Sequence, residues 1–296
     1  MPSSNASPPS RLDNLVALTR LDRPIGIWLL LWPTLWAVWI AGDGHPSFRM
    51  VLIFSLGVVL MRSAGCVIND YADRDFDSQV WRTVDRPIAA GRVRPEDALW
   101  IFAGLVAVSA SLLLFLNRAT FYWSFGALAL ATLYPFMKRH TYLPQVVLGA
   151  AFSWAIPMAF VAQGKTPDSL CWLLYAANLA WTVGYDTQYA MADRHDDLKA
   201  GVKSTAILFG EMDLFIIACL QTLFLAGLAL VGRQLQLGWP WWAGLAGAVG
   251  LFAWQLRHTL TRQPVACLEA FKHNHWVGML VFVALLAGWL QHVAPA

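Results

Sequence analysis

Two short segments carry most of the acidic side chains of this chain. Of its 18 Asp and Glu residues, seven lie in Asp70–Asp97 and six lie in Asp186–Asp213. The first segment begins just after a long apolar run with "NDYADRDFD", and the second contains "YDTQYAMADRHDD". Carboxylates this close together repel one another unless positive charge lies between them. Each segment therefore predicts a site for a cation.

The spacing of these acids is helical. In each segment three aspartates share one helix face, because successive residues advance by about 100°. They are Asp70, Asp73 and Asp77 in the first segment and Asp186, Asp193 and Asp197 in the second. Asp75 and Asp196 fall away from these faces. Two facing lines of carboxylates would form a site for hard divalent cations, and Mg²⁺ in particular combines a few carboxylates with substrate phosphates.

The two acidic segments also share a sequence frame. A-D-R-x-x-D occurs at Ala72–Asp77 and again at Ala192–Asp197, an offset of 120 residues. Each copy follows a long apolar run. We interpret the pair as an internal duplication, which predicts that the second and sixth spans pack close together and that their carboxylates face each other across a gap.

Basic residues near the acids indicate what the cation holds. They are Arg82 and Arg86 after the first segment's aspartates, Lys199 and Lys203 after the second's, and Lys138 and Arg139 in "YPFMKRHTYLPQ". Lys and Arg beside a metal–carboxylate site are suited to a diphosphate, whose oxygens both can bind. No GxxxxGK[ST] stretch occurs, so a P-loop nucleotide site is not indicated.

The composition indicates what must position these residues. Of 296 residues, 58% are hydrophobic and 13% charged, whereas soluble domains carry about 25% charged residues. Nine apolar stretches approach the ~20 residues that a helix needs to cross a bilayer. They are Ile25–Ala41, Met50–Ile68, Ala98–Leu116, Phe121–Met137, Leu143–Ala162, Ser169–Tyr185, Leu214–Val231, Trp241–Leu256 and Trp276–Val293. The expected fold is an all-α, polytopic membrane bundle of nine helices around a central cavity, with residues 1–17 as a disordered tail and 18–296 as one domain.

The basic residues also predict the orientation of these spans. With nine spans, sixteen Lys and Arg residues fall on the side of the N-terminus and four on the other side. Positive charge marks the cytoplasmic side. The N-terminus is therefore expected in the cytoplasm and the C-terminus outside, with both acidic segments cytoplasmic.

Other functional classes fit less well. A transporter would carry ionisable residues inside its spans, and only Arg62 lies there. The net charge of +3 does not indicate nucleic-acid binding, and the four cysteines form no CxxC pair. His273 and His275 in "KHNHW" are expected in a solvated loop before the last span.

The two motifs and their surroundings resemble the UbiA-type intramembrane prenyltransferases, and within that family the branch that uses 4-hydroxybenzoate. The first segment is similar to the family's NDxxDxxxD motif at Asn69, Asp70, Asp73 and Asp77, and the second to YDxxxxxxDxxxD at Tyr185, Asp186, Asp193 and Asp197. "LDRPIGIWLLLWPTLWA", "DRPIAAGRV" and "DLKAGVKSTAILFG" add to a resemblance that runs from about Leu18 to the C-terminus.

This resemblance implies a Mg²⁺-dependent aromatic prenyltransferase of ubiquinone biosynthesis in the bacterial inner membrane. Its donor would be a polyprenyl diphosphate, with the tail in the lipid bilayer, and its acceptor the carbon of 4-hydroxybenzoate ortho to the hydroxyl. The implied metal ligands are Asn69, Asp70, Asp73, Asp77, Asp193 and Asp197. Asp186 and Arg139 are the candidate catalytic residues, and Arg20 and Arg23, with Arg139, are candidates for binding the acceptor carboxylate. A menaquinone-type or haem-type acceptor is the alternative, and no nucleic acid or obligate protein partner is expected.

Overall fold

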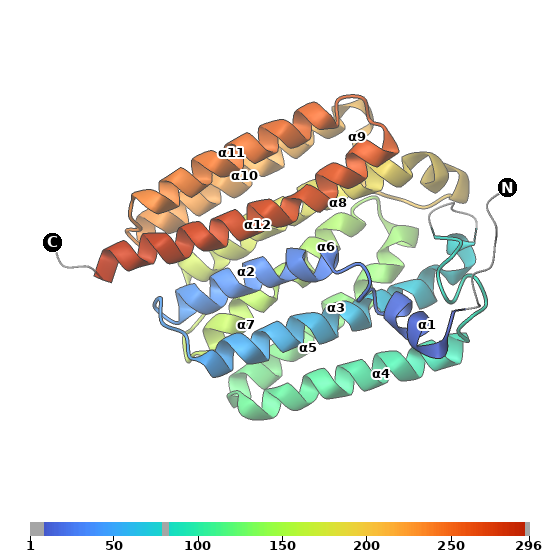
Figure 1. The fold of residues 1–296 in the computed structure, drawn as a ribbon, viewed down its shortest axis with the longest axis horizontal. Helices are drawn as coiled ribbons and strands as arrows, with labels where there is room; N and C mark the ends of the chain where they lie inside the picture. The colour runs from blue at the N-terminus through green and yellow to red at the C-terminus, as the bar shows by residue number, and fades with distance from the viewer. Residues whose placement is uncertain (1–8, 79–82, 294–296) are drawn as a thin grey trace.

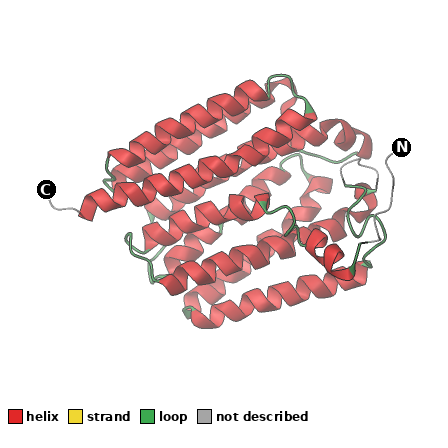
Figure 2. Ribbon diagram, in the orientation of Figure 1, coloured by secondary structure: helices red, strands yellow, loops and turns green. Residues whose placement is uncertain are grey.

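The computed structural model of this chain describes residues 9–78 and 83–293, which form helices and short connections without a strand (Figures 1 and 2). The helices are α1 (Arg11–Leu18), α2 (Ile25–Ala41), α3 (Phe48–Asp77), α4 (Pro95–Leu112), η1 (Leu113–Phe115), α5 (Arg118–His140), α6 (Pro144–Ser153), α7 (Ala155–Ala162), α8 (Ser169–Ala200), α9 (Thr205–Phe209), η2 (Gly210–Met212), α10 (Asp213–Gln234), α11 (Trp239–His258) and α12 (Pro264–Val293). The all-helical class expected from the composition is confirmed.

Several of these helices are long and apolar enough to cross a membrane. Among the described residues, five stretches meet both criteria, and α2 is apolar but shorter. The five are Phe48–Asp75, Pro95–Phe115, Pro144–Ala162, Thr205–Gln234 and Pro264–Leu290. They coincide with the second, third, fifth, seventh and ninth apolar stretches of the sequence.

One expected span is broken into two helices. α6 ends at Ser153, and α7 begins at Ala155. Pro157 lies four residues after Ser153, and a proline ring clashes with the carbonyl four residues before it while offering no N–H to that carbonyl. The break therefore lies where the sequence makes a continuous helix most costly.

The structure departs from expectation near both ends of the chain. α1 occupies part of the segment expected to be a disordered tail, because Ser10 and Asp13 form a reciprocal capping box and Leu18 is fully buried. α12 begins at Pro264, so His273 and His275 lie within a helix and the expected loop is wrong. Asn274 in this part of α12 is buried against α8, where its side-chain oxygen accepts a hydrogen bond from Trp181 Nε1 at 2.9 Å.

α8 is the central helix of the bundle. It packs on α6, α10 and α12, whereas α3 packs mainly on α2 and α4, so the expected close packing of the second and sixth spans on each other is wrong. Three rings from separate helices form the core around it: Trp181 of α8 stacks on Trp36 of α2 at 5.5 Å and on Phe224 of α10 at 5.1 Å. α3 and α8 both carry their C-terminal ends to the same end of the bundle, near α1 and α9 (Figure 1). The two acidic segments therefore lie at one end of the molecule.

Candidate active site

The aspartates of α3 are divided between the interior and the surface as their spacing predicts. Asp70, Asp73 and Asp77 are buried, whereas the Asp75 side chain is 71% exposed. α3 continues as a helix to Asp77, well beyond its apolar part. The expected helix face is confirmed.

The aspartates of α8 line the same cavity. Asp186, Asp193 and Asp197 face it across from the aspartates of α3, and Asp186 and Asp193 are buried. α8 runs unbroken from Ser169 to Ala200, so these acids also extend a transmembrane-length helix beyond its apolar part. The cavity has a volume of about 970 Å³. The same cavity is therefore lined by both acidic motifs, which are 120 residues apart in sequence.

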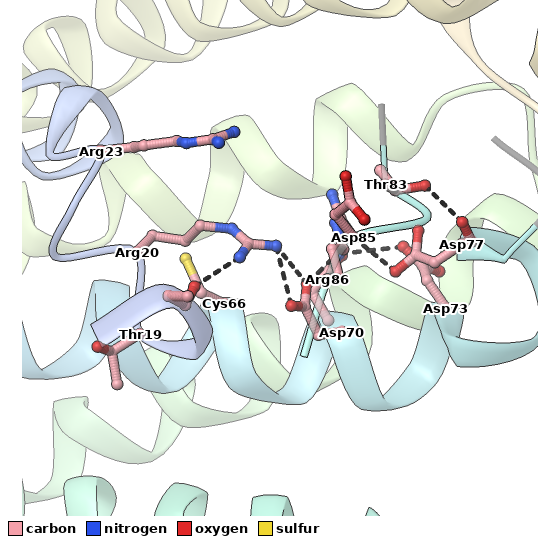
Figure 3. Close-up of polar contacts among 12 residues, drawn as sticks. Thr19, Arg20, Arg23, Cys66, Asp70, Asp73, Asp77, Thr83, Asp85 and Arg86 are labelled. Atoms are coloured by element: carbon pink, nitrogen blue, oxygen red, sulfur yellow. Dashed lines mark hydrogen bonds and ion pairs between the residues drawn. The ribbon is translucent and has the colours of Figure 1, made fainter. Parts of the chain in front are cut away.

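Basic side chains hold the α3 carboxylates in place. Arg86 Nη1 lies 3.0 Å from Asp70 and 2.7 Å from Asp77. Arg20 Nη2 lies 2.9 Å from Asp70, and Figure 3 shows the Arg20 side chain directed at this carboxylate. Lys138 Nζ, at the end of α5, lies 2.8 Å from Asp73. These cations occupy the positions beside the carboxylates that a metal and a diphosphate would share.

The charges at this site are not fully balanced. Burial raises the pKa of Asp77 to about 6, even though Arg86 lies beside it. Burial also disfavours the charge of Arg86, but the carboxylates of Asp70 and Asp77 outweigh burial and raise its pKa. Arg86 therefore stays charged beside Asp77, whose ionisation is opposed by burial. Additional positive charge would stabilise the ionised carboxylates.

The donor atoms suit Mg²⁺, although they do not yet converge on one point. Carboxylate and amide oxygens are the ligands of hard cations, and Asn69 Oδ1 is buried without a hydrogen-bond partner while Asn69 Nδ2 donates to Asp73 at 3.0 Å. Among the described residues, no three Asp, Glu, His or Cys groups are placed to hold a metal together. Metal binding would therefore require the carboxylates to exchange their Arg and Lys partners.

The other basic residues selected from the sequence lie in different surroundings. Arg23 lines the cavity with Arg20, Arg86 and Lys138, whereas Arg139, Lys199 and Lys203 are not part of the described lining. Arg139 Nη2 donates to the Ala72 carbonyl at 2.6 Å, so it ties α5 to the backbone of α3. Lys203 Nζ lies 5.5 Å from the Tyr142 ring centroid. Arg82 lies outside the described residues.

Arg62 belongs to the site, although neither acidic motif nor the basic residues around them indicated it. Arg62 lies on α3 two turns before Asn69 and lines the cavity. Its Nη1 donates to Cys66 Sγ at 2.9 Å, its guanidinium lies over the Phe152 ring, and its Nε is buried without a partner. No carboxylate among the described residues forms an ion pair with it. A signal existed, because a lone charge inside a span is generally functional.

Gly26 of α2 makes room for Arg62. A Cβ atom at Gly26 would lie 2.3 Å from Arg62 Nε, so any larger residue would displace the guanidinium. The cavity thus contains a positioned cation that forms no ion pair with a carboxylate of the described residues, although Asp186 lies within electrostatic reach of it. An anionic group of a ligand is the natural counterpart.

The rest of the cavity is apolar and aromatic. One part lies between α4 and α5, where Val106, Ser109 and Ala110 face Ala127 and Leu128. Nearer the acids, the lining contains Tyr134, Tyr185, Tyr189 and Phe271. Such a compartment accommodates a ligand that has a long apolar part and a highly charged head.

Sequence comparison relates this chain to a known family. The model of a family described as "UbiA prenyltransferase family" matches residues 30–286. A "4-hydroxybenzoate octaprenyltransferase" of Pseudomonas entomophila (strain L48) is 60% identical over 273 residues, which is 92% of each chain. A protein of the same description from Acinetobacter baylyi is 56% identical and covers 94% of this chain and 97% of its own.

Solved structures share the fold at lower sequence identity. A UbiA homologue from Aeropyrum pernix K1 matches with a TM-score of 0.77 and 23% identity, covering 88% of this chain and 96% of its own. A UbiA homologue from Archaeoglobus fulgidus, solved bound to GPP and Mg²⁺, matches with a TM-score of 0.68 and 16% identity, covering 92% and 99%.

Proposed function

Since the chain belongs to the UbiA prenyltransferase family, we propose that it transfers a polyprenyl chain from polyprenyl diphosphate to 4-hydroxybenzoate. The acceptor carbon is the one ortho to the hydroxyl, and the reaction is an early membrane step of ubiquinone biosynthesis. Relatives that are 56–61% identical carry the description "4-hydroxybenzoate octaprenyltransferase". The observation that carries the proposal is the single cavity that combines paired acidic motifs, the cation Arg62 and an apolar region.

The donor's diphosphate binds at the acidic end of the cavity. Asn69, Asp70, Asp73 and Asp77 on α3, with Asp193 and Asp197 on α8, are the proposed ligands of Mg²⁺. A UbiA homologue of the same fold was solved with Mg²⁺ bound. When bound, the metal supplies Lewis-acid neutralisation of the charge on the departing diphosphate. Arg86 and Lys138 exchange their carboxylate partners for diphosphate oxygens, and we keep Arg82, Arg139, Lys199 and Lys203 as candidates from the sequence.

The acceptor binds deeper in the cavity. Arg62 pairs with its carboxylate, because this guanidinium lines the cavity and forms no ion pair with a carboxylate of the described residues. This assignment places Arg62 ahead of Arg20 and Arg23, since Arg20 is already paired with Asp70 and Arg23 lies beside Asp22 at 3.5 Å.

The reaction itself exchanges one bond for another. The allylic C–O bond of the donor breaks as the diphosphate leaves with its electron pair, and the ring carbon of the acceptor forms the new C–C bond. The ring then loses its proton to the Asp186 carboxylate, which restores aromaticity. The apolar lining excludes water, which would otherwise capture the allylic cation.

We further propose the arrangement of the chain in the membrane. Residues 18–296 form one domain with nine spans, the acidic end of the cavity faces the cytoplasm, and the C-terminus lies in the periplasm of a bacterial inner membrane. The support is the division of basic residues between the two sides, sixteen against four. The donor's head group then enters from the cytoplasm while its tail stays among the helices.

A prenyl-transfer assay tests the function. Membranes containing the protein are given Mg²⁺, a polyprenyl diphosphate and separate aromatic acceptors, including 4-hydroxybenzoate, a naphthoate of the menaquinone type and a haem. We expect prenylated 4-hydroxybenzoate, and we expect a chelator to abolish its formation until Mg²⁺ is restored. If the naphthoate or the haem is prenylated in preference, the proposed acceptor is wrong. If product still forms in chelator-treated membranes, the proposed metal site is wrong.

A further inference from the structure

A second buried carboxylate site lies outside the cavity. Asp213, the first residue of α10, has a fully buried side chain that binds two guanidinium groups. Arg262 Nε lies 3.1 Å from both carboxylate oxygens, and Arg262 Nη2 lies 3.0 Å from Oδ1. Arg194 Nη2 donates to Oδ2 from the other side. We name Arg194, Asp213 and Arg262 the Asp213 triad.

The triad joins three segments that are distant in sequence. Arg194 lies on α8, Asp213 begins α10, and Arg262 lies in the connection between α11 and α12. Arg262 has a left-handed backbone conformation with φ of 53°, which residues other than glycine seldom adopt. Its Nη2 also donates to the Glu211 carbonyl at 2.9 Å. The connection is thus held in an unusual conformation by the contacts of one side chain.

The triad acts on the helix that carries the second acidic motif. Arg194 directly follows Asp193 and lies roughly 80° around the α8 axis from Asp186, beside the acidic stripe rather than within it. Since Arg194 is anchored to α10, α8 cannot rotate without breaking a buried ion pair. Removing one partner of such a pair leaves an uncompensated charge.

We propose that the Asp213 triad is a positioning device that sets the rotation of α8, so that Asp193 and Asp197 face the cavity. This inference rests on the proposed function, because it treats those aspartates as ligands of the metal–diphosphate complex. None of the three triad residues is among the lining of the cavity. They act through the orientation of α8, not through contact with substrate.

The duplicated A-D-R-x-x-D frame provides a matched control. Arg74 occupies the place in the first copy that Arg194 occupies in the second. Arg74 lies over the Tyr71 ring at 4.6 Å, and its Nη1 donates to the Tyr71 carbonyl of its own helix. Within the described residues, these contacts and an ion pair with Asp75 at 3.9 Å all lie on α3 itself. Arg74→Ala removes the same side chain from the same motif without releasing the helix.

The test compares Arg194→Ala, Asp213→Asn and Arg74→Ala in purified protein. Mn²⁺ binding in the presence of inorganic diphosphate is followed by electron paramagnetic resonance. A prenyl-transfer assay then measures two quantities: the Mg²⁺ concentration that gives half of the maximal rate, and the KM for 4-hydroxybenzoate. We expect Arg194→Ala and Asp213→Asn to weaken Mn²⁺ binding about tenfold or more and to raise the Mg²⁺ requirement similarly, with the acceptor KM within about twofold of wild type. Arg74→Ala should match wild type in all three quantities.

The outcomes separate this inference from the proposed function. If both triad variants bind Mn²⁺ like wild type, or lose activity only in proportion to the folded fraction, the positioning role is wrong and the function stands. If the wild-type protein itself neither binds Mn²⁺ with diphosphate nor transfers prenyl, the proposed function fails and the inference with it. If Arg194→Ala cannot be purified, Arg194→Lys carries the same comparison, since it keeps the charge while losing the planar guanidinium.

Discussion

At the scale of single residues, the structure distinguishes side chains that the sequence places close together. Asp73 and Asp75 are two positions apart on α3, yet Asp73 is buried beside Lys138 while Asp75 is exposed. Lys138 and Arg139 are adjacent, yet Lys138 lies in the cavity and Arg139 binds the α3 backbone. Neighbours in sequence therefore have separate roles.

We predict a strong contrast between Asp73 and Asp75. Asp73→Ala should lower kcat/KM by about 100-fold or more, because it removes a proposed metal ligand and leaves Lys138 without its buried partner. Asp75→Ala should change kcat/KM by less than about threefold, since its side chain points to solvent. Steady-state rates in membranes with matched protein levels measure both. Equal losses at the two positions would show that the helix face does not define the site.

Arg62 gives a second prediction at this scale. Arg62→Gln should raise the KM for 4-hydroxybenzoate by roughly 10- to 100-fold, because the buried acceptor carboxylate would lose its charged partner. With an uncharged acceptor such as 4-hydroxybenzamide, the kcat/KM of the same variant should change little. Its preference for 4-hydroxybenzoate over the amide should therefore decline. Arg118→Gln, a basic residue at the opposite end of α5, is the control. An unchanged KM for 4-hydroxybenzoate would show that Arg62 does not bind the acceptor carboxylate.

At the scale of elements, the helices around the cavity differ in what they supply. α3 and α8 provide the acids, and the last turn of α5 provides Lys138. α4 and α5 line the apolar part, where Ser109 faces the cavity and the adjacent Val108 is 55% exposed on the outer surface. This division assigns the donor's tail to the space between α4 and α5.

We therefore predict that a bulky residue at Ser109 discriminates between donors by length. Ser109→Trp should reduce transfer from a long polyprenyl diphosphate by about tenfold or more, because the indole fills space that the tail requires. Transfer from geranyl diphosphate should fall much less, since its short chain ends nearer the acids. Val108→Trp adds the same ring on the outer face and should affect neither donor. An equal loss with both donors would place the tail elsewhere.

At the scale of the whole molecule, both acidic motifs and α1 lie at one end of the bundle, while α12 ends at the other (Figure 1). The mechanism requires the acidic end to meet a water-soluble acceptor and the apolar part to meet lipid. The distribution of Lys and Arg predicts that the acidic end lies in the cytoplasm.

Cysteine labelling tests this orientation. In a Cys-free background, Ser78→Cys after α3 and Ala200→Cys at the end of α8 should react with a thiol reagent only from the cytoplasmic side. Ser47→Cys, in the exposed connection between α2 and α3, should react with an impermeant reagent added outside. Labelling of Ser78→Cys or Ala200→Cys from outside would contradict the proposed span count and orientation.

The sequence alone determined the helical class, most helix positions and the two acidic faces. These are local properties: an apolar run of spanning length forms a helix because unpaired backbone is costly in lipid, and the helical repeat places Asp70, Asp73 and Asp77 on one face. The interruption at Pro157 was equally local, although the apolar pattern of Leu143–Ala162 concealed it. α12 was predicted too short, because Asn274 in the polar "KHNHW" is buried by hydrogen-bond partners on α8 that only the fold supplies.

The tertiary structure decided which cations meet which acids. Helical periodicity shows which residues share a face, but not which other helix covers that face. Arg20 and Arg86 reach Asp70 from loops that are 50 and 16 residues away in sequence, and Arg62 lies in a cavity wall that exists only when α2, α3 and α5 assemble. The Asp213 triad likewise requires three separated segments to meet. Packing between distant segments, rather than any local pattern, determines the electrostatics of this site.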